Sequence, residues 1–143
     1  MTIKQISIFA ENRPGGVLNV VQALAGASVD IRALNVADTK DYGIIRMIVS
    51  DTEKAEEVLT ANGGVYIVND VIGVRIPDTP GGLSVVLSLL AKKNVNVEYL
   101  YAFINHSGSN ACVVLRVNDN EYAQGVLSSA GMSLLSDEDI KNL

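Results

Sequence analysis

The chain has few of the residues that build metal, redox or nucleic-acid sites. Its 143 residues include no tryptophan, one histidine and one cysteine, Cys112, which has no partner for an internal disulfide and cannot alone form a thiolate cage. Acidic residues outnumber basic ones by 16 to 11, and the net charge of -5 has the wrong sign for binding a nucleic-acid backbone. We therefore expect no metal, no other cofactor and no nucleic-acid partner.

Long apolar runs are missing as well. No run approaches the roughly 18 residues that a membrane span needs. The opening segment MTIKQISIFA lacks a basic region followed by a long apolar stretch. We expect a cytoplasmic protein with no membrane association. The 48% of hydrophobic and 19% of charged residues provide enough apolar material for a core, which excludes a disordered chain.

An internal repeat organises the chain. Residues 14–34 match residues 80–100 at a shift of 66, with eight identities over 21 positions, and residues 49–63 match residues 117–131 at a shift of 68. The change of shift places a two-residue insertion in the second copy, most simply in the hairpin around residues 106–110. The sequence is therefore a tandem duplication, and we divide it into domains at residues 1–70 and 71–143.

Both repeats predict the same order of elements. Alternating apolar residues indicate strands, helical spacing indicates helices, and glycine or proline marks their ends. After a first strand around residues 6–8, the expected elements are helix 16–25, strands 29–36 and 43–49, helix 53–62, strand 65–68, strand 71–76, helix 82–92, strands 97–104 and 111–117, helix 121–130 and strand 133–135. This β-α-β-β-α-β order, twice over, predicts two ferredoxin-like units of the α+β class, joined by the short linker Asn69-Asp70.

The residues that usually carry catalysis stand in unpromising places. His106 lies in a Gly/Ser/Asn-rich loop, where a solvated turn residue is a simpler interpretation than a general base. Cys112 lies in an apolar strand, which favours an inert buried thiol over a nucleophile. The acidic group at residues 137–139 is more simply a solvated terminus than a metal site. We predict that the chain is not an enzyme.

Three aromatic residues alternate along one expected strand and share one of its faces. Exposed, Tyr99, Tyr101 and Phe103 would form a stacking platform of the kind that RNA-recognition domains use. Buried, they would form a core face or a contact between the two units. We favour the buried interpretation, because the chain is acidic and has few aromatic residues.

A Pro-Gly-Gly segment precedes the first helix of each repeat. The two segments read Asn12, Arg13, Pro14, Gly15, Gly16 and Asp78, Thr79, Pro80, Gly81, Gly82. Free backbone N–H groups at a helix N-terminus favour an anion such as a carboxylate, glycine lets a ligand approach the backbone, and proline presets the first helical turn. The alternative is a plain strand-to-helix turn that Asn12 or Asp78 caps. Because both repeats keep the segment, we favour a ligand site.

The two repeats resemble a pair of ACT domains, the small-molecule-sensing modules of amino-acid metabolism. The resemblance rests on the duplicated element order and on the segment of a polar residue, one further residue and Pro-Gly-Gly before the first helix, and it covers nearly the whole chain. Residues 11–15 in particular resemble the loop of serine-sensing ACT domains, although Ala10 stands where those domains carry a histidine. The resemblance implies a non-catalytic regulatory protein that binds a free L-amino acid.

The resemblance also implies an arrangement of the units. They would pair side by side in one eight-stranded antiparallel sheet, with helices on one face and ligands at the seam. Each site would join the loop of one unit to the start of the second strand of the other. The expected site residues are Asn12, Arg13, Pro14, Gly15 and Gly16 opposite Asn96 and Val97, and Asp78, Thr79, Gly81 and Gly82 opposite Asp30 and Ile31. The first site carries amides and the second carboxylates, so we expect unequal affinities.

The partners are less defined by the sequence. Most ACT domains are attached to an enzyme or a transcription factor, and these 143 residues leave no room for one. A free-standing sensor of this kind would act on a separate enzyme chain and could form a homodimer. The alternative is an interaction subunit that binds a biosynthetic enzyme with little or no ligand binding.

Overall fold

A computed structural model describes residues 1–38, 41–104, 108 and 110–143. Within these residues the elements follow the predicted order up to the last strand, except that one strand ends the first repeat and also begins the second. The elements are β1 (Ile3–Glu11), α1 (Gly16–Gly26), β2 (Ile31–Asp38), β3 (Tyr42–Val49), α2 (Thr52–Ala61), β4 (Val65–Pro77), α3 (Gly82–Lys92), β5 (Val97–Ala102), β6 (Asn110–Val117), α4 (Asn120–Ser129) and α5 (Asp137–Lys141). His106 and most of the expected insertion lie outside the described residues.

The strands form a single antiparallel sheet of six strands in the order β2-β3-β1-β4-β6-β5, so the expected eight-stranded sheet is wrong. The strands expected on either side of Asn69-Asp70 are one continuous strand, β4, because the supposed linker keeps its pairing with β1. The segment expected to form the last strand contributes only an isolated bridge between Val74 and Leu134. Two predicted strands have thus merged, and one has shrunk to a bridge.

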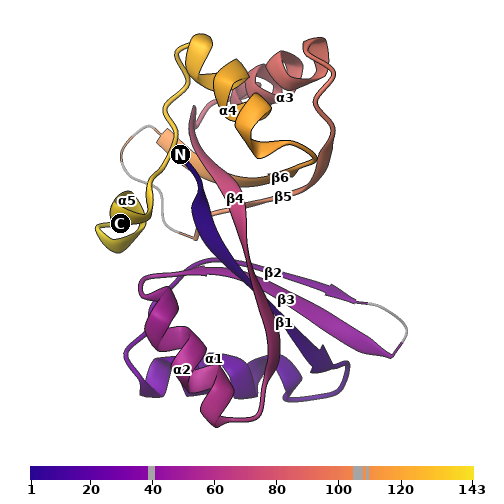
Figure 1. Cartoon of the computed structure of the whole chain (residues 1–143), viewed down its shortest axis with the longest axis vertical. Helices are drawn as coiled ribbons and strands as arrows, with labels where there is room; N and C mark the ends of the chain where they lie inside the picture. The colour runs from indigo at the N-terminus through magenta and orange to yellow at the C-terminus, as the bar shows by residue number, and fades with distance from the viewer. Residues whose placement is uncertain (39–40, 105–107, 109) are drawn as a thin grey trace.

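Strand β4 belongs to both units. Its first half pairs with β1 up to Val71, and its second half pairs with β6 from Ile72 onward. Figure 1 shows β4 crossing from the lower lobe, which holds β2, β3 and the end of β1, to the upper lobe, which holds β5 and β6. The predicted domain boundary between residues 70 and 71 therefore falls inside a regular strand.

The helices lie on the outside of both lobes, α1 and α2 below and α3 and α4 above (Figure 1), whereas the resemblance implied one helical face. The sheet curls until its two end strands meet, where Ala33 of β2 bridges to Phe103 and the Ile104 N–H donates to the Arg32 carbonyl at 2.8 Å. Apolar clusters fill the space between the sheet and each helix pair, and a third cluster fills the space between the two halves of the sheet.

The third cluster decides the role of the alternating aromatics. Tyr101 and Phe103 are buried in it, and Tyr99 packs against it. These side chains therefore form the predicted contact between the units and are not exposed for base stacking. Cys112 is buried in the same cluster, as expected for an inert thiol, and burial raises the pKa of its thiol.

The final helix, α5, was not predicted. Ser136 and Asp139 form a capping box at the start of the helix. The Ser136 side chain accepts from the Asp139 backbone N–H, and the Asp139 side chain accepts from the Ser136 backbone N–H. The hydrogen bonds from Ser136 also lower the pKa of the Asp139 carboxyl. The acidic residues at 137–139 are therefore the first turn of a helix, and the S-x-x-D spacing was the sequence signal for it.

Two further observations bear on function. Within the described ranges, no helix has the length and apolar character needed to cross a bilayer. Within the same ranges, His, Cys, Asp and Glu side chains form no group of three or more that could hold a metal ion.

Candidate functional site

The segment before each first helix is a tight turn. The Gly16 N–H donates to the Arg13 carbonyl at 3.1 Å, and Gly15 has φ of 84° and ψ of -6°. Proline in the second position and a positive φ in the third define a type II turn. The second repeat has the same turn, with a 3.0 Å bond from the Gly82 N–H to the Thr79 carbonyl. The prolines therefore shape a turn before each helix and do not occupy the first helical turn.

Each glycine of the two pairs has a backbone reason of its own. Gly15 and Gly81 both have φ of 84°, a conformation that other residues adopt only with strain. A Cβ at Gly16 would lie 2.7 Å from the Glu11 carbonyl oxygen, and one at Gly82 would lie 2.1 Å from that of Pro77. The geometry of the turns accounts for the glycines, so the glycines alone no longer indicate a ligand.

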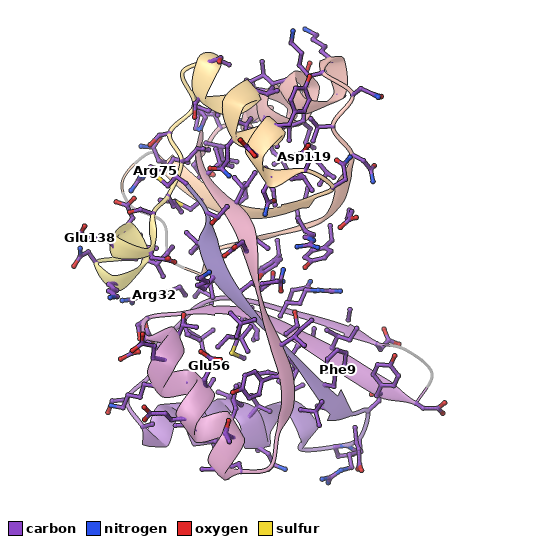
Figure 2. The ribbon with its side chains drawn as sticks, viewed as in Figure 1. Phe9, Arg32, Glu56, Arg75, Asp119 and Glu138 are labelled. Carbon is purple, nitrogen blue, oxygen red and sulfur yellow. The ribbon has the colours of Figure 1, made fainter. Side chains whose placement is uncertain are left out.

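Helix capping separates these two helices from the others. Asp51 caps α2, Asp119 caps α4 and Ser136 caps α5, each through its side chain. Helices α1 and α3 begin without a side-chain cap, so neither Asn12 nor Asp78 plays the capping role that the alternative required. Figure 2 labels Asp119 at the start of α4, where it accepts from the Tyr122 N–H at 3.0 Å.

The uncapped starts leave backbone donors available. In α1 the first helical bond runs from the Asn19 N–H to the Gly15 carbonyl at 2.9 Å. The N–H groups of Val17 and Leu18 therefore precede the helical ladder, and no side chain of the described residues accepts from them. The surrounding loop is exposed, and its one cation, Arg13, forms an ion pair with Glu11 at 2.7 Å. An external carboxylate could accept from such donors.

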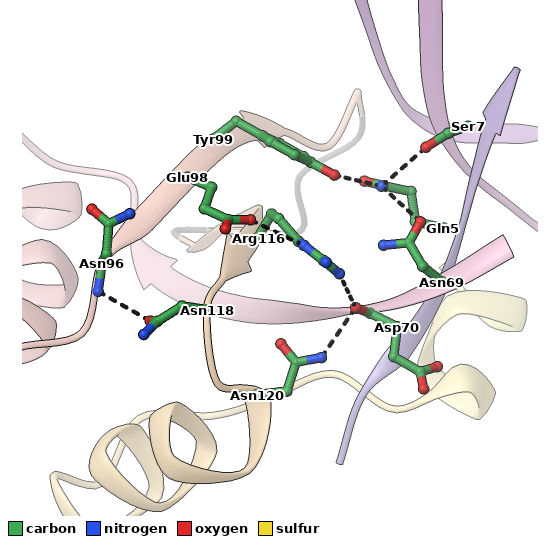
Figure 3. A network of polar contacts seen from close by, with 10 residues as sticks. All are labelled: Gln5, Ser7, Asn69, Asp70, Asn96, Glu98, Tyr99, Arg116, Asn118 and Asn120. Atoms are coloured by element: carbon green, nitrogen blue, oxygen red, sulfur yellow. Dashed lines mark hydrogen bonds and ion pairs between the residues drawn. The ribbon is translucent and has the colours of Figure 1, made fainter. Parts of the chain in front are cut away.

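The start of the second strand of each repeat makes the same kind of hydrogen bond, from a backbone N–H to a side-chain oxygen. The Asp30 N–H donates to Ser50 Oγ at 2.9 Å, and the Asn96 N–H donates to Asn118 Oδ1 at 3.3 Å. Figure 3 shows the second of these pairs beside the contact between the units. The side chains differ, because Asp30 carries a carboxylate and Asn96 a neutral amide.

Within one chain, the structure does not bring the predicted loops and strand starts together. Tyr99, two residues after Val97, lies against Gln5, and Glu11 at the loop lies six residues further along β1, about 20 Å away at the rise of a strand. In the described part of the chain, no hydrogen bond or ion pair joins residues 12–16 to residues 96–97, or residues 78–82 to residues 30–31.

Three surface hollows lie elsewhere. They have volumes of about 630, 580 and 680 Å³, and they lie between α3 and α4, between the start of α2 and α5, and along α2. None of these three is lined by a predicted site residue. Sequence reasoning also missed Arg32, whose guanidinium joins the start of β2 to α5, because only the fold places α5 there.

The comparisons with known proteins agree with this architecture. The model of the ACT domain pair matches residues 1–143, so the chain belongs to the family of ACT domain pair proteins. Among solved structures, protein BT0572 from Bacteroides thetaiotaomicron is 37% identical, with a TM-score of 0.92, covering 100% of this chain and 98% of that one. No match was found among the curated proteins.

Two more distant structures share the fold. The regulatory subunit of aspartate kinase from Thermus thermophilus, in its ligand-free form, is 21% identical with a TM-score of 0.67, covering 90% of this chain and 89% of that one. The corresponding subunit from Thermus flavus is 22% identical with a TM-score of 0.61, covering 90% of each chain. This chain is thus structurally similar to regulatory subunits of an enzyme, and its described residues include no catalytic domain.

Proposed function

We propose that this chain is a non-catalytic regulatory protein that senses a free L-amino acid and acts on a separate enzyme chain. The observation that carries the proposal is the pair of uncapped helices, α1 and α3, in a molecule whose other described helices are capped. An amino-acid carboxylate bound there would supply the missing acceptor. Membership of the ACT domain pair family and the likeness to aspartate kinase regulatory subunits support the regulatory role.

A second copy of the chain would complete the site. The ammonium group of the ligand needs a carboxylate or amide oxygen, which Asp30 and Asn96 offer, but both lie away from the loops of their own chain. Helices α1 and α3 also expose apolar side chains: Leu18 is 55% exposed and Val85 is 50% exposed. Pairing these helices across two chains would cover that surface and set each loop against a partner's strand start.

Ligand binding can be tested by thermal shift and calorimetry against the twenty amino acids. An amino acid at one hundred times its dissociation constant should add about 2.7 kcal/mol to the free energy of unfolding. Asn12→Ala and Asp78→Ala are suitable variants, because neither residue caps a helix and neither change should weaken folding. If no amino acid stabilises the ligand-free protein, the sensing proposal is wrong.

The same titration separates two other expectations. The site of Asn12 and Asn96 should bind a zwitterion more tightly than the site of Asp78 and Asp30, because two carboxylates repel the carboxylate of the ligand. Two equal affinities would contradict this asymmetry. The alternative function, an interaction subunit without ligand binding, rests on the exposed apolar faces of α1 and α3, and it would be favoured by a flat response to every amino acid.

Dimerisation has its own test. Leu18→Glu should place a charge in the proposed contact between chains and shift sedimentation toward the monomer. Ile67→Glu is the control, since Ile67 is equally exposed, at 55%, but lies on β4 between Tyr66 and Val68. Those two neighbours pack toward α1 and α2, so the Ile67 side chain faces away from these helices. A wild-type chain that stays monomeric at high concentration would refute the shared site.

A further inference from the structure

Helix α5 follows the second repeat in sequence but packs on strands β1 and β3 of the first. Ile140 is buried in the cluster between the units, among Ile3 and Ile48, and the Lys4 N–H donates to Asp137 Oδ1 at 3.2 Å. The C-terminal helix of the second unit thus packs on the first unit and is hydrogen-bonded to it. Figure 1 shows α5 beside the junction of the two lobes.

One guanidinium joins α5 to the start of β2. Arg32 donates from Nε to the Ile140 carbonyl at 3.1 Å, from Nη2 to the Lys141 carbonyl at 3.0 Å, and from Nη1 to Asp30 Oδ2 at 2.6 Å. Its side chain is only 12% exposed, whereas that of Asp30 is 64% exposed. Figure 2 shows Arg32 directly below α5, which carries the labelled Glu138. The Asp30 carboxylate is therefore accessible to solvent, whereas the guanidinium that it contacts is largely buried.

The duplication supplies an internal comparison. The positions 66 residues after Asp30 and Arg32 are Asn96 and Glu98. Glu98 carries the opposite charge to Arg32 and accepts from Arg116 Nε at 3.2 Å. The link from strand start to helix end is thus a feature of the first repeat alone, where the extra helix docks.

We propose that Arg32 is a positioning residue that couples the start of β2 to the docking of α5. Asp30 holds the planar guanidinium in the orientation that serves both carbonyls of α5. A cationic group that binds Asp30 competes with Arg32 for the same carboxylate and loosens α5. Because such coupling is reciprocal, undocking α5 frees Asp30 to bind that group more tightly. This coupling rests on the proposed function only in taking the ligand's ammonium as the cation.

Hydrogen exchange in the ligand-free protein tests the coupling without any ligand. Peptides covering residues 136–143 should exchange about five-fold faster in Asp30→Asn, the change expected when one charge-assisted bond is lost from a partly exposed site. Arg32→Lys should accelerate the same peptides at least as much, because an ammonium group cannot serve three acceptors with the geometry of the guanidinium. Peptides from α3 and α4 should not change.

Glu98→Gln is the matched control, because it weakens an ion pair at the equivalent position of the second repeat, where α5 is not involved. It should leave exchange at residues 136–143 unchanged. If Arg32→Lys accelerates α5 but Asp30→Asn does not, Arg32 holds the helix independently of Asp30 and the coupling is wrong. The coupling is equally wrong if Glu98→Gln accelerates α5 as much as Asp30→Asn. Since no ligand is added, either result leaves amino-acid sensing to its own titration.

Discussion

The contact between the two units has a polar centre that can be tested by a double-mutant cycle. Gln5 of β1 is fully buried, its Oε1 accepts from Tyr101 OH at 2.6 Å, and its Nε2 donates to Tyr99 OH at 2.7 Å. Weaker bonds of 3.4 Å reach Ser7 and Asn69 (Figure 3). One amide thus satisfies two tyrosines from the other unit.

Replacing Gln5 with leucine keeps the volume but leaves the buried hydroxyl of Tyr101 without its acceptor. We expect a loss of about 2–3 kcal/mol, the usual cost of an unpaired buried group together with the lost bonds. Tyr101→Phe should cost about 1–2 kcal/mol. The double variant should cost less than the sum of the two single losses by about 1 kcal/mol or more. The reason is that Tyr101→Phe removes the hydroxyl that Gln5→Leu leaves without an acceptor.

Urea unfolding of the four proteins measures the free energies of the cycle. In thermal unfolding, a loss of about 2 kcal/mol should lower Tm by about 7 °C in a chain of 143 residues. Tyr99→Phe is the comparison, because the ring of Tyr99 is only partly buried and lies under the Arg46 guanidinium at 4.0 Å. Water can replace its bond more easily, so its cost should be smaller. Strictly additive losses at Gln5 and Tyr101 would refute the view that the amide and hydroxyl act as a pair.

Three further predictions concern single residues. Gly82→Ala should destabilise the fold by about 2–3 kcal/mol, because its Cβ would overlap a backbone oxygen. Gly125→Ala should stabilise the fold by about 1 kcal/mol, because Gly125 lies in the middle of α4 with open space around it. Urea midpoints that move in the same direction for both variants would contradict this contrast. The lowered pKa of Asp139 means that its carboxylate stabilises the fold above the ordinary value of 3.8 and ceases to do so as the pH falls through the folded value. Asp139→Asn should therefore lose less stability than the wild type on acidification through that range, and parallel acid-unfolding curves would disprove it. The raised pKa and burial of the Cys112 thiol should make its alkylation at pH about 8 much slower than in the urea-unfolded chain, and equal rates would show that it is open to solvent.

The segments of the candidate site can be recognised in the sequence, but their arrangement in space cannot. The two Pro-Gly-Gly segments are recognisable as breaks between a strand and a helix, and both helices begin at the predicted residues. The type II turn that each segment forms was not predicted. Their capping state was not recognisable, since Asn12 and Asp78 are residue types that often cap helices. Only the backbone path shows that neither does so. The proposed opposition of loops and strand starts came from the family resemblance, and one chain does not contain it.

The element order follows from the sequence alone, because helical spacing, strand alternation and glycine stops are local signals that both repeats carry. The number of strands and their partners does not, because strand pairing depends on the main chain of distant segments. Asn69 and Asp70 look like a polar linker, yet Asn69 contacts Gln5, and Asp70 forms an ion pair with Lys4 that raises the pKa of that lysine.

The tertiary structure alone decided how the two units meet. Alternation places Tyr99 and Tyr101 on one face, but only the curl of the sheet sets that face against Gln5. The link from Arg32 to α5 likewise joins residues more than a hundred positions apart. Local patterns specify which faces are apolar, whereas the partner of each face depends on the packing of the whole chain, in which burial of the remaining apolar surface selects one arrangement.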